Sequence, residues 1–225
     1  MTLFLVEGIT DVNLVRYIYS EIDERFDFYD FVAPKRGTKS KVVTFKNKKH
    51  NNLQIINLKG QDNLLFTLQE LLKPNEESIQ QVAIISDADR DFEASKQMVT
   101  KAIEASKIDK DKFSIFLTPN NKELGNLETL LLSSLDKANI PQLQCFEEYK
   151  KCLKKEIEDI EQRAIDKHEV EAYIKFSEKP RNRNQAQFSF IDKSGDTGLW
   201  DLSRNEFSPI VNFVESVLKR QYEKN

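Results

Sequence analysis

Residues 81–89 read QVAIISDAD, a short apolar run that ends in two aspartates separated by one residue. Its length and its flanking polar residues are typical of a strand that is buried on both faces. A helical pattern over 91–106 follows, and a second apolar run comes at 113–117. This order of strand, helix and strand predicts a parallel βαβ unit.

The amino-terminal part of the chain repeats this alternation. Residues 3–6 form an apolar run that leads directly into Glu7, and a helical pattern with Thr10 or Asp11 as its cap follows. Residues 53–58 predict a further strand, and 62–72 return to helical spacing. Two weaker stretches are an aromatic one at 26–32, which can add a short strand, and one at 34–50, which fits a loop or an extended hairpin. We therefore expect an α/β fold with a doubly wound, mostly parallel sheet flanked by helices.

The pattern becomes helical after about residue 137. Helices are predicted over about 143–158, 161–178 and 207–222, and Pro119 marks a break before this part. No repeat or low-complexity linker divides the chain. We expect a single domain over 1–225, with a core of about 1–136 and a helical elaboration of about 137–225. Trp200 is expected to pack under the last helix, whose apolar stripe can serve a core or a homodimer; the sequence leaves both open.

Composition excludes several classes of protein. The chain has 225 residues, which suffices to bury a core without disulfides or structural metals. No apolar run approaches the roughly 20 residues that cross a bilayer, and the first one meets an acid at Glu7, too early for a signal peptide. The two cysteines, Cys145 and Cys152, match no zinc pattern and are expected as buried or half-buried free thiols. These features favour a cytoplasmic protein with no membrane contact.

Charge is unevenly distributed along the chain. The formal net charge is −3, so the molecule as a whole is not a polyanion binder. One segment, however, carries seven basic residues and no acid, and a solvated loop or a phosphate-binding surface would each explain it. Its members, which we take as candidate nucleic-acid-binding residues, are Lys35, Arg36, Lys39, Lys41, Lys46, Lys48 and Lys49. A second basic cluster is Lys179, Arg181 and Arg183.

Acidic residues follow the two clearest strands. Glu7 and Asp11 come after the first strand, and Asp87 and Asp89 come after the strand at 81–86. The carboxyl ends of parallel strands line the ligand crevice of such sheets, so these acids should converge. Asp87 and Asp89 would project to the same side of an extended segment, while Asp91 is expected to cap the following helix. Crowded carboxylates with oxygen ligands favour Mg²⁺ or Mn²⁺.

The two acidic motifs resemble those of a known family. Residues 4–11 (FLVEGITD) resemble the hhhEGxxD opening of the Toprim (topoisomerase–primase) domain, where h is hydrophobic, and residues 84–89 (IISDAD) resemble its hhhDxD motif. The resemblance implies a Toprim-type sheet in which Asp87 and Asp89 hold Mg²⁺. Glu7 would then act as general acid/base or as a further ligand.

A closer likeness is to small stand-alone Toprim-like bacterial proteins related to the overcoming-lysogenization-defect nucleases. It extends to a Pro-containing break at 119–121, a G-x-L-E-x-L-L segment at 125–131 and a G-x-W-D segment at 198–201. The likeness implies that Asp11 and Glu128 contribute to a second metal or its surroundings. It also implies that Lys167 stabilises charge in the transition state. A helix-start acid and a surface lysine are the alternative interpretations of Glu128 and Lys167.

These observations lead to a hypothesis with alternatives. The leading one is metal-dependent hydrolysis of a DNA or RNA phosphodiester, in nucleic-acid processing or phage defence. The second is a regulatory or nucleic-acid-binding module that is non-catalytic or activated by a partner. The chain has no Gly-rich phosphate-binding loop, so an ATPase partner would be a separate polypeptide. A phosphatase of the haloacid-dehalogenase class is weaker, because it would leave Glu7 unexplained. The substrate and the number of metal ions stay open.

Overall fold

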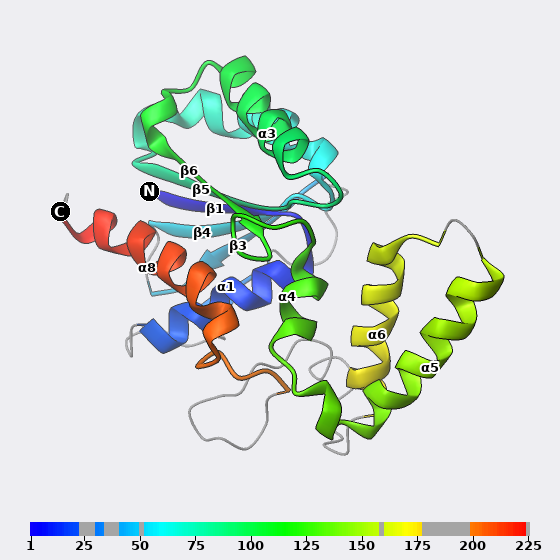
Figure 1. Cartoon of the computed structure of the whole chain (residues 1–225). Helices are drawn as coiled ribbons and strands as arrows, with labels where there is room; N and C mark the ends of the chain where they lie inside the picture. The colour runs from blue at the N-terminus through cyan, green and yellow to red at the C-terminus, as the bar shows by residue number, and fades with distance from the viewer. Residues whose placement is uncertain (23–29, 34–40, 50–51, 158–159, 177–198, 224–225) are drawn as a thin grey trace.

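The centre of the molecule is a six-stranded sheet with the order β2-β3-β4-β1-β5-β6 (Figure 1). The computed structural model describes residues 1–22, 30–33, 41–49, 52–157, 160–176 and 199–223. The strands are β1 (Thr2–Val6), β2 (Phe31–Val32), β3 (Val43–Asn47), β4 (Leu53–Asn57), β5 (Gln81–Asp87) and β6 (Phe113–Thr118).

The strand pairings confirm the predicted α/β class. β1 pairs in parallel with both β4 and β5, and β5 pairs in parallel with β6, whereas β3 runs antiparallel to β2 and β4. The chain leaves β1 towards β4 on one side and adds β5 and β6 on the other. The strand order therefore reverses next to β1, which is where ligands bind in open α/β sheets.

Helices cover both faces of the sheet. α1 (Ile9–Ile22) and α8 (Ser208–Glu223) lie on one face, and the segment α2 (Leu64–Phe66) with η3 (Thr67–Leu72) and α3 (Phe92–Ser106) lies on the other (Figure 1). η3 has π-helical hydrogen bonding, so the helix predicted over 62–72 forms but is not a regular α-helix. The shorter helical turns are η2 (Gln61–Asn63), η4 (Lys73–Ser78), η5 (Lys110–Lys112), η6 (Lys137–Asn139) and η7 (Asn205–Phe207).

The helical elaboration stands at the carboxyl ends of the parallel strands. α4 (Leu127–Ser133) leads from the sheet to α5 (Pro141–Glu156) and α6 (Gln162–Phe176), which pack against each other as a hairpin. Figure 1 shows β1 running from the chain start towards the side on which α6 stands. α6 also packs on α4, so the hairpin is attached to the body through that helix.

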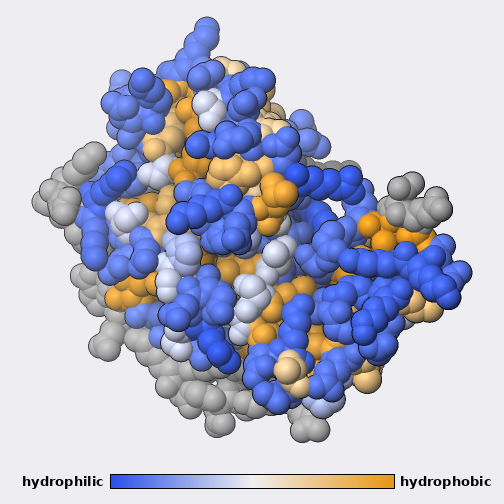
Figure 2. All heavy atoms as spheres, viewed as in Figure 1, coloured by the Kyte–Doolittle hydropathy of each residue, from blue (hydrophilic) through white to orange (hydrophobic). Residues whose placement is uncertain are grey.

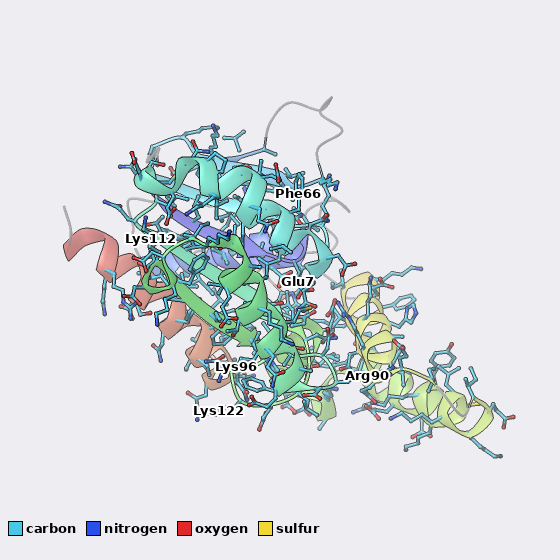
Figure 3. All side chains as sticks on the ribbon, turned by 90° about the horizontal axis from the view of Figure 1, so that it is seen from above. Glu7, Phe66, Arg90, Lys96, Lys112 and Lys122 are labelled. Carbon is cyan, nitrogen blue, oxygen red and sulfur yellow. The ribbon has the colours of Figure 1, made fainter. Side chains whose placement is uncertain are left out.

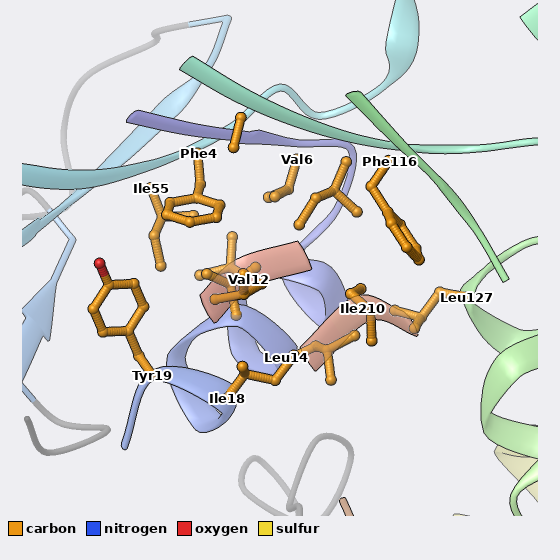
Figure 4. Close-up of a cluster of buried hydrophobic side chains, with 14 of the residues drawn as sticks. Phe4, Val6, Val12, Leu14, Ile18, Tyr19, Ile55, Phe116, Leu127 and Ile210 are labelled. Carbon is orange, nitrogen blue, oxygen red and sulfur yellow. The ribbon is translucent and has the colours of Figure 1, made fainter. Parts of the chain in front are cut away.

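The core explains why the short strands are apolar throughout. Phe4 and Val6 of β1 point into the cluster that α1 and α8 cover, shown in Figure 4, whereas Leu3 and Leu5 point into the cluster on the α3 side. Every residue of β5 is buried as well. A strand without a polar face is expected where helices cover both sides of a sheet.

The last helix, α8, and the single tryptophan both contribute to the hydrophobic core. Trp200 is buried and packs edge-on against Tyr173 with ring centroids 5.2 Å apart. The apolar stripe of α8 faces the same core through Ile210, Val214 and Val217. Trp200 belongs to the same buried cluster, in agreement with the prediction, and these residues of α8 form part of the core.

The expectation for the two cysteines has a clear outcome. Cys145 and Cys152 are free thiols, but both are exposed, so the expectation of burial was wrong. They lie on α5, whose outer surface faces solvent. None of the described helices is long and apolar enough to cross a membrane. Figure 2 shows mostly hydrophilic residues on the visible face, with apolar residues between them.

Candidate functional site

The ends of β1 and β5 bring Glu7 next to Asp87. Val6 pairs with Ile85 in the ladder, so the next residues of both strands lie side by side. The Ser86 hydroxyl donates a hydrogen bond to Glu7 Oε1 at 2.5 Å, and the Asp87 backbone N–H donates to the same oxygen at 3.0 Å. The expected convergence of the two acidic motifs is thus present in the structure, and Figure 3 labels Glu7 at this end of the sheet.

Asp87 is held by the elements on its other side. Its Oδ1 accepts hydrogen bonds from the Thr118 hydroxyl at 2.7 Å and from the Leu127 backbone N–H at 3.1 Å. Burial raises the pKa of Asp87 well above its usual range, and the charges of Glu7 and Asp11 raise it further. The carboxylate is therefore fixed in position, and its surroundings disfavour the ionised form.

Asp11 belongs to the same group of acids. Its Oδ2 accepts a hydrogen bond from the Gly8 backbone N–H at 2.9 Å, which holds the first turn of α1 against the Glu-Gly turn. Burial, then Glu7, and then Glu128 raise the pKa of Asp11 to about 7. Glu128 lies half-buried in the first turn of α4. The four acids Glu7, Asp11, Asp87 and Glu128 thus share one electrostatic environment.

Asp89 departs from the expected extended conformation. Its φ is +52°, so the chain turns at this residue. The turn is fixed by two backbone hydrogen bonds, from Asp89 N to Gly125 O at 2.7 Å and from Gly125 N to Asp89 O at 3.0 Å. Asp91, in contrast, caps α3 as predicted by accepting from the Ala94 N–H at 2.9 Å. The two aspartates of the motif therefore reach a common partner through a turn and not through alternation along a strand.

We predict that Gly125→Ala destabilises this turn. Gly125 has φ +136°, and an added Cβ would lie 2.8 Å from Thr129 Oγ1. Strain and the displaced Thr129 should lower the free energy of unfolding by about 2 kcal/mol. Chemical denaturation measures this change. Gly60→Ala is the matched control, because Gly60 also has a positive φ (+118°) but no atom near its Cβ position. Equal losses of unfolding free energy in the two variants would show that the contact with Thr129 does not contribute to the effect.

The common partner of the two aspartates is Arg163, which sequence reasoning missed. Its Nη1 donates to Asp89 Oδ1 at 2.7 Å, and its Nη2 donates to Asp87 Oδ2 at 3.2 Å. Arg163 lies in the first turn of α6, one turn before the predicted Lys167. Lys167 is exposed, and within the described residues it forms no hydrogen bond or ion pair with these acids. The sequence carried no signal for Arg163 beyond its place on a predicted helix.

α6 is held beside the acids by contacts of its own. Asp166 is buried and accepts hydrogen bonds from the Thr129 hydroxyl at 3.1 Å and from Gln162 Nε2 at 2.6 Å. Just before α6, Glu161 forms an ion pair with Arg90 at 2.7 Å. Figure 3 shows Arg90 between the body and this helix. The position of Arg163 is therefore set by helix packing and not by its own ion pairs alone.

The acids offer ligands for a cation, although not as a complete cage. Among the residues that the structure describes, no three His, Cys, Asp or Glu side chains are arranged to hold a metal ion. Asp87 and Asp89 nevertheless bind one positive group, the Arg163 guanidinium. Mg²⁺ is commonly bound by one or two carboxylates, with water and substrate phosphate as the other ligands. Two carboxylates that converge on a cation fit that mode of binding.

The basic segment is divided between the two ends of the sheet. Val43 and Val6 both pair with Asn57, so the start of β3 lies at the acidic end of the sheet. Lys41, two residues earlier, therefore lies towards this end. Its Nζ stands 4.5 Å from the centre of the Phe66 ring. Lys46 pairs with Gln54, so it lies near the opposite end together with Lys48 and Lys49. Lys49 forms an ion pair with Asp30 at 2.8 Å. Lys35, Arg36, Lys39 and the second basic cluster lie outside the described residues.

A cleft opens beside the acids. Its volume is about 730 Å³, and its walls come from the turn at 89–91, the start of α3, residues 124–129 and the start of α6. Arg90 and Arg163 both line it, as does the exposed Leu124. This volume lies in the range of small-molecule sites in proteins. The Arg163 guanidinium thus contacts both the acid pair and the cleft.

Comparisons with known proteins give a family but no activity. Two solved structures were matched: a GDP-bound mutant of S. thermophilus NFeoB (12% identity, TM-score 0.19) and a GDP-bound mutant of the S. thermophilus FeoB G-domain (11% identity, TM-score 0.19). Each alignment covers 97% of this chain and 90% of the other. At that TM-score, neither bears on fold or function. No curated protein matches. The family described as "Protein of unknown function (DUF3226)" matches residues 1–219, and the chain belongs to this family.

Proposed function

We propose that this chain is a metal-dependent phosphodiesterase that cleaves nucleic acid, DNA or RNA, in the cytoplasm. The observation that carries the proposal is the contact of Glu7 with Ser86 and Asp87 at the reversal of strand order, with Asp89 beside them. The resemblance of residues 4–11 and 84–89 to the two Toprim motifs supports the same chemistry. The motifs and the geometry point to the same three acids. Acids that follow two strands by chance would not be expected to match both motifs.

The roles of the acids follow from their hydrogen bonds. Asp87 and Asp89 would hold Mg²⁺ or Mn²⁺, which when bound polarises a phosphate oxygen and lowers the pKa of a bound water. Both hydrogen bonds to Glu7 end on Oε1, and they orient the carboxylate so that its other oxygen can accept a proton from the attacking water. Asp11 and Glu128 add negative charge behind this position and so strengthen the attraction for a cation.

The cleft provides the route for the substrate. Its wall meets the acid pair at Asp89, so a phosphate in the cleft would lie beside the catalytic carboxylates. Lys41 lies at the same end of the sheet and can contact the backbone of a bound strand. Lys46, Lys48 and Lys49 lie at the other end and are left out of this interface. Because these are contacts to phosphates, binding should weaken with salt and show little sequence preference.

The direct test is a cleavage assay of the purified chain. Supercoiled plasmid, single-stranded DNA and single-stranded RNA are incubated with Mg²⁺, Mn²⁺ or EDTA. We expect cleavage of at least one substrate with a divalent cation and none with EDTA. Asp109→Asn serves as a matched control, since Asp109 also caps a helical turn, η5, but does not line the cleft. Cleavage that continues in EDTA would contradict a metal-dependent mechanism.

A second candidate function is a partner-activated module. It is favoured by the ion pairs of Arg163 with Asp87 and Asp89, because they engage the two carboxylates that the reaction requires. Such a protein would bind Mn²⁺ or nucleic acid but cleave only after a partner, for instance a separate ATPase in phage defence, moves α6. Metal binding without cleavage, followed by cleavage when the partner is added, would favour this alternative.

A further inference from the structure

Arg163 shares its position with the cation that the proposed function requires. Its two terminal nitrogens bind one carboxylate each, so the guanidinium bridges Asp87 and Asp89. Mg²⁺ binds carboxylate oxygens at about 2.0–2.1 Å and repels a neighbouring positive charge. A divalent ion on this pair and the guanidinium in its present place would therefore compete for the same oxygens.

The Arg163 side chain can leave without a movement of its helix. α6 is anchored by the Asp166–Thr129 hydrogen bond and by the buried side chains of Ile165 and Val170. The Arg163 side chain itself is 51% exposed and borders the cleft. Rotation about its side-chain bonds would take the guanidinium from the acids into the cleft while the helix backbone stays in place.

A second guanidinium stands at the same cleft. Arg90 also lines it, and its ion pair with Glu161 joins side chains that are 73% and 60% exposed. Exposed ion pairs of this kind contribute little free energy, so a better ligand can replace Glu161. Guanidinium groups bind phosphate through two parallel hydrogen bonds, a geometry that lysine cannot provide. The cleft wall thus carries two groups suited to a phosphodiester.

The charges at the site determine the order in which the metal ion and the phosphate bind. Without a metal ion, a phosphate in the cleft would face Asp89, while Arg163 would stay paired with Asp87 and Asp89. A divalent ion balances the two charges of Asp87 and Asp89 and releases Arg163 at the same time. The affinity of the cleft for phosphate should therefore rise once the metal is bound.

We propose that Arg163 is a displaceable cation that couples the two ligands. Metal binding at Asp87 and Asp89 releases its guanidinium into the cleft, where it binds a backbone phosphate of nucleic acid together with Arg90. This inference rests on the proposed function, because it assumes that Asp87 and Asp89 form the metal site. It adds an internal competitor for the metal and a phosphate-binding pair that the Toprim motifs do not contain.

The first measurement is Mn²⁺ binding to the protein alone, by titration calorimetry or by the electron paramagnetic resonance signal of free Mn²⁺. Removing the competitor in Arg163→Ala should tighten Mn²⁺ binding by about fivefold to tenfold, the equivalent of one charge-assisted ion pair. Arg163→Lys keeps the charge and should bind Mn²⁺ much as the unmodified protein does. Circular dichroism confirms that each variant is folded.

The second measurement is the binding of phosphorothioate single-stranded DNA and RNA oligonucleotides with and without Mn²⁺. In the unmodified protein Mn²⁺ should strengthen this binding. Both Arg163→Ala and Arg163→Lys should lose most of the Mn²⁺-dependent gain, and Arg90→Ala should lose part of it. Arg163→Lys thereby separates the two roles, because it preserves the competition but not the paired hydrogen bonds to phosphate.

The outcomes separate this inference from the proposed function. Equal Mn²⁺ affinities of the unmodified protein and Arg163→Ala would overturn the inference and leave the metal site intact. Absence of Mn²⁺ binding in both proteins would remove the metal site, and both proposals with it. Mn²⁺ binding that persists in Asp87→Asn would place the ion elsewhere and equally overturn both. Tighter Mn²⁺ binding with weaker oligonucleotide binding in Arg163→Ala is the result that the inference requires.

Discussion

The variant Asp87→Asn is expected to lose metal-dependent cleavage by about a thousandfold, because one charged ligand contributes several kcal/mol to a divalent-metal site. Asparagine keeps the oxygen that accepts from Thr118 and Leu127. It lacks the negative charge and the second oxygen, Oδ2, which accepts from Arg163 in the structure and would bind the metal ion. The rate of cleavage with saturating Mn²⁺ is the measurement, on the nucleic acid that the unmodified protein cleaves best.

The same variant should fold at least as well as the unmodified protein. Burial and neighbouring acids raise the pKa of Asp87, so its charge destabilises the folded state at neutral pH. A normal or higher melting temperature would therefore show that the loss of activity comes from chemistry. Glu7→Gln should lose activity to a similar extent, and Asp109→Asn should retain it. Cleavage within tenfold of normal in both Asp87→Asn and Glu7→Gln would rule out the mechanism.

A second large effect is expected for Asp11→Asn, as a gain of stability that depends on pH. The folded-state pKa of Asp11 is about 7, above its ordinary value of 3.8. The folded protein thus holds this proton more tightly than the unfolded chain does. The corresponding stability is fully present below about pH 4 and is lost as the pH rises through about 7. The asparagine amide can still accept the Gly8 hydrogen bond and carries no charge at any of these pH values.

The size and the test of this effect follow from the pKa. At pH 8 Asp11→Asn should be more stable by about 3–4 kcal/mol, after subtraction of about 0.5–1 kcal/mol for the lost interaction with the α1 dipole. At pH 4 the two proteins should differ little. Urea denaturation at both pH values gives the free energies of unfolding. A difference that is constant with pH would show that Asp11 is not the group responsible.

Added metal provides a further check on Asp11. Saturating Mn²⁺ should stabilise the unmodified protein more than Asp11→Asn, because the cation favours the charged form of the acids around it. The difference between the two proteins at pH 8 should then become smaller. An unchanged difference would place Asp11 outside the influence of the ion.

The sheet and its acidic end could be predicted because they depend on local patterns. The runs at 3–6 and 81–86 are apolar throughout, and parallel strands bring their carboxyl ends to one edge. Glu7 and Asp87 directly follow these runs, so their proximity needs only the register of two neighbouring strands. No other long-range information is required for this part of the site.

Arg163 could not be predicted, since its place depends on how α6 docks on α4. That docking is set by Asp166 and Thr129, which are far apart in the sequence and have no distinctive motif. The turn at Asp89 likewise depends on Gly125, its distant backbone partner. The division of the basic segment could not be predicted for a related reason: β3 runs antiparallel to β4, so lysines that are close in sequence lie at opposite ends of the sheet.

The central position of β1 has a consequence for how the chain acquires its structure on the ribosome. β1 is made before both of its neighbours in the sheet. It has no hydrogen-bonding partner until β4 has emerged near residue 57, and its other edge stays unpaired until β5 has emerged near residue 87. One apolar face of the sheet then stays uncovered until α8 has been synthesised. The nascent chain therefore exposes a hydrophobic edge for much of its synthesis, a period in which chaperones can protect it from aggregation.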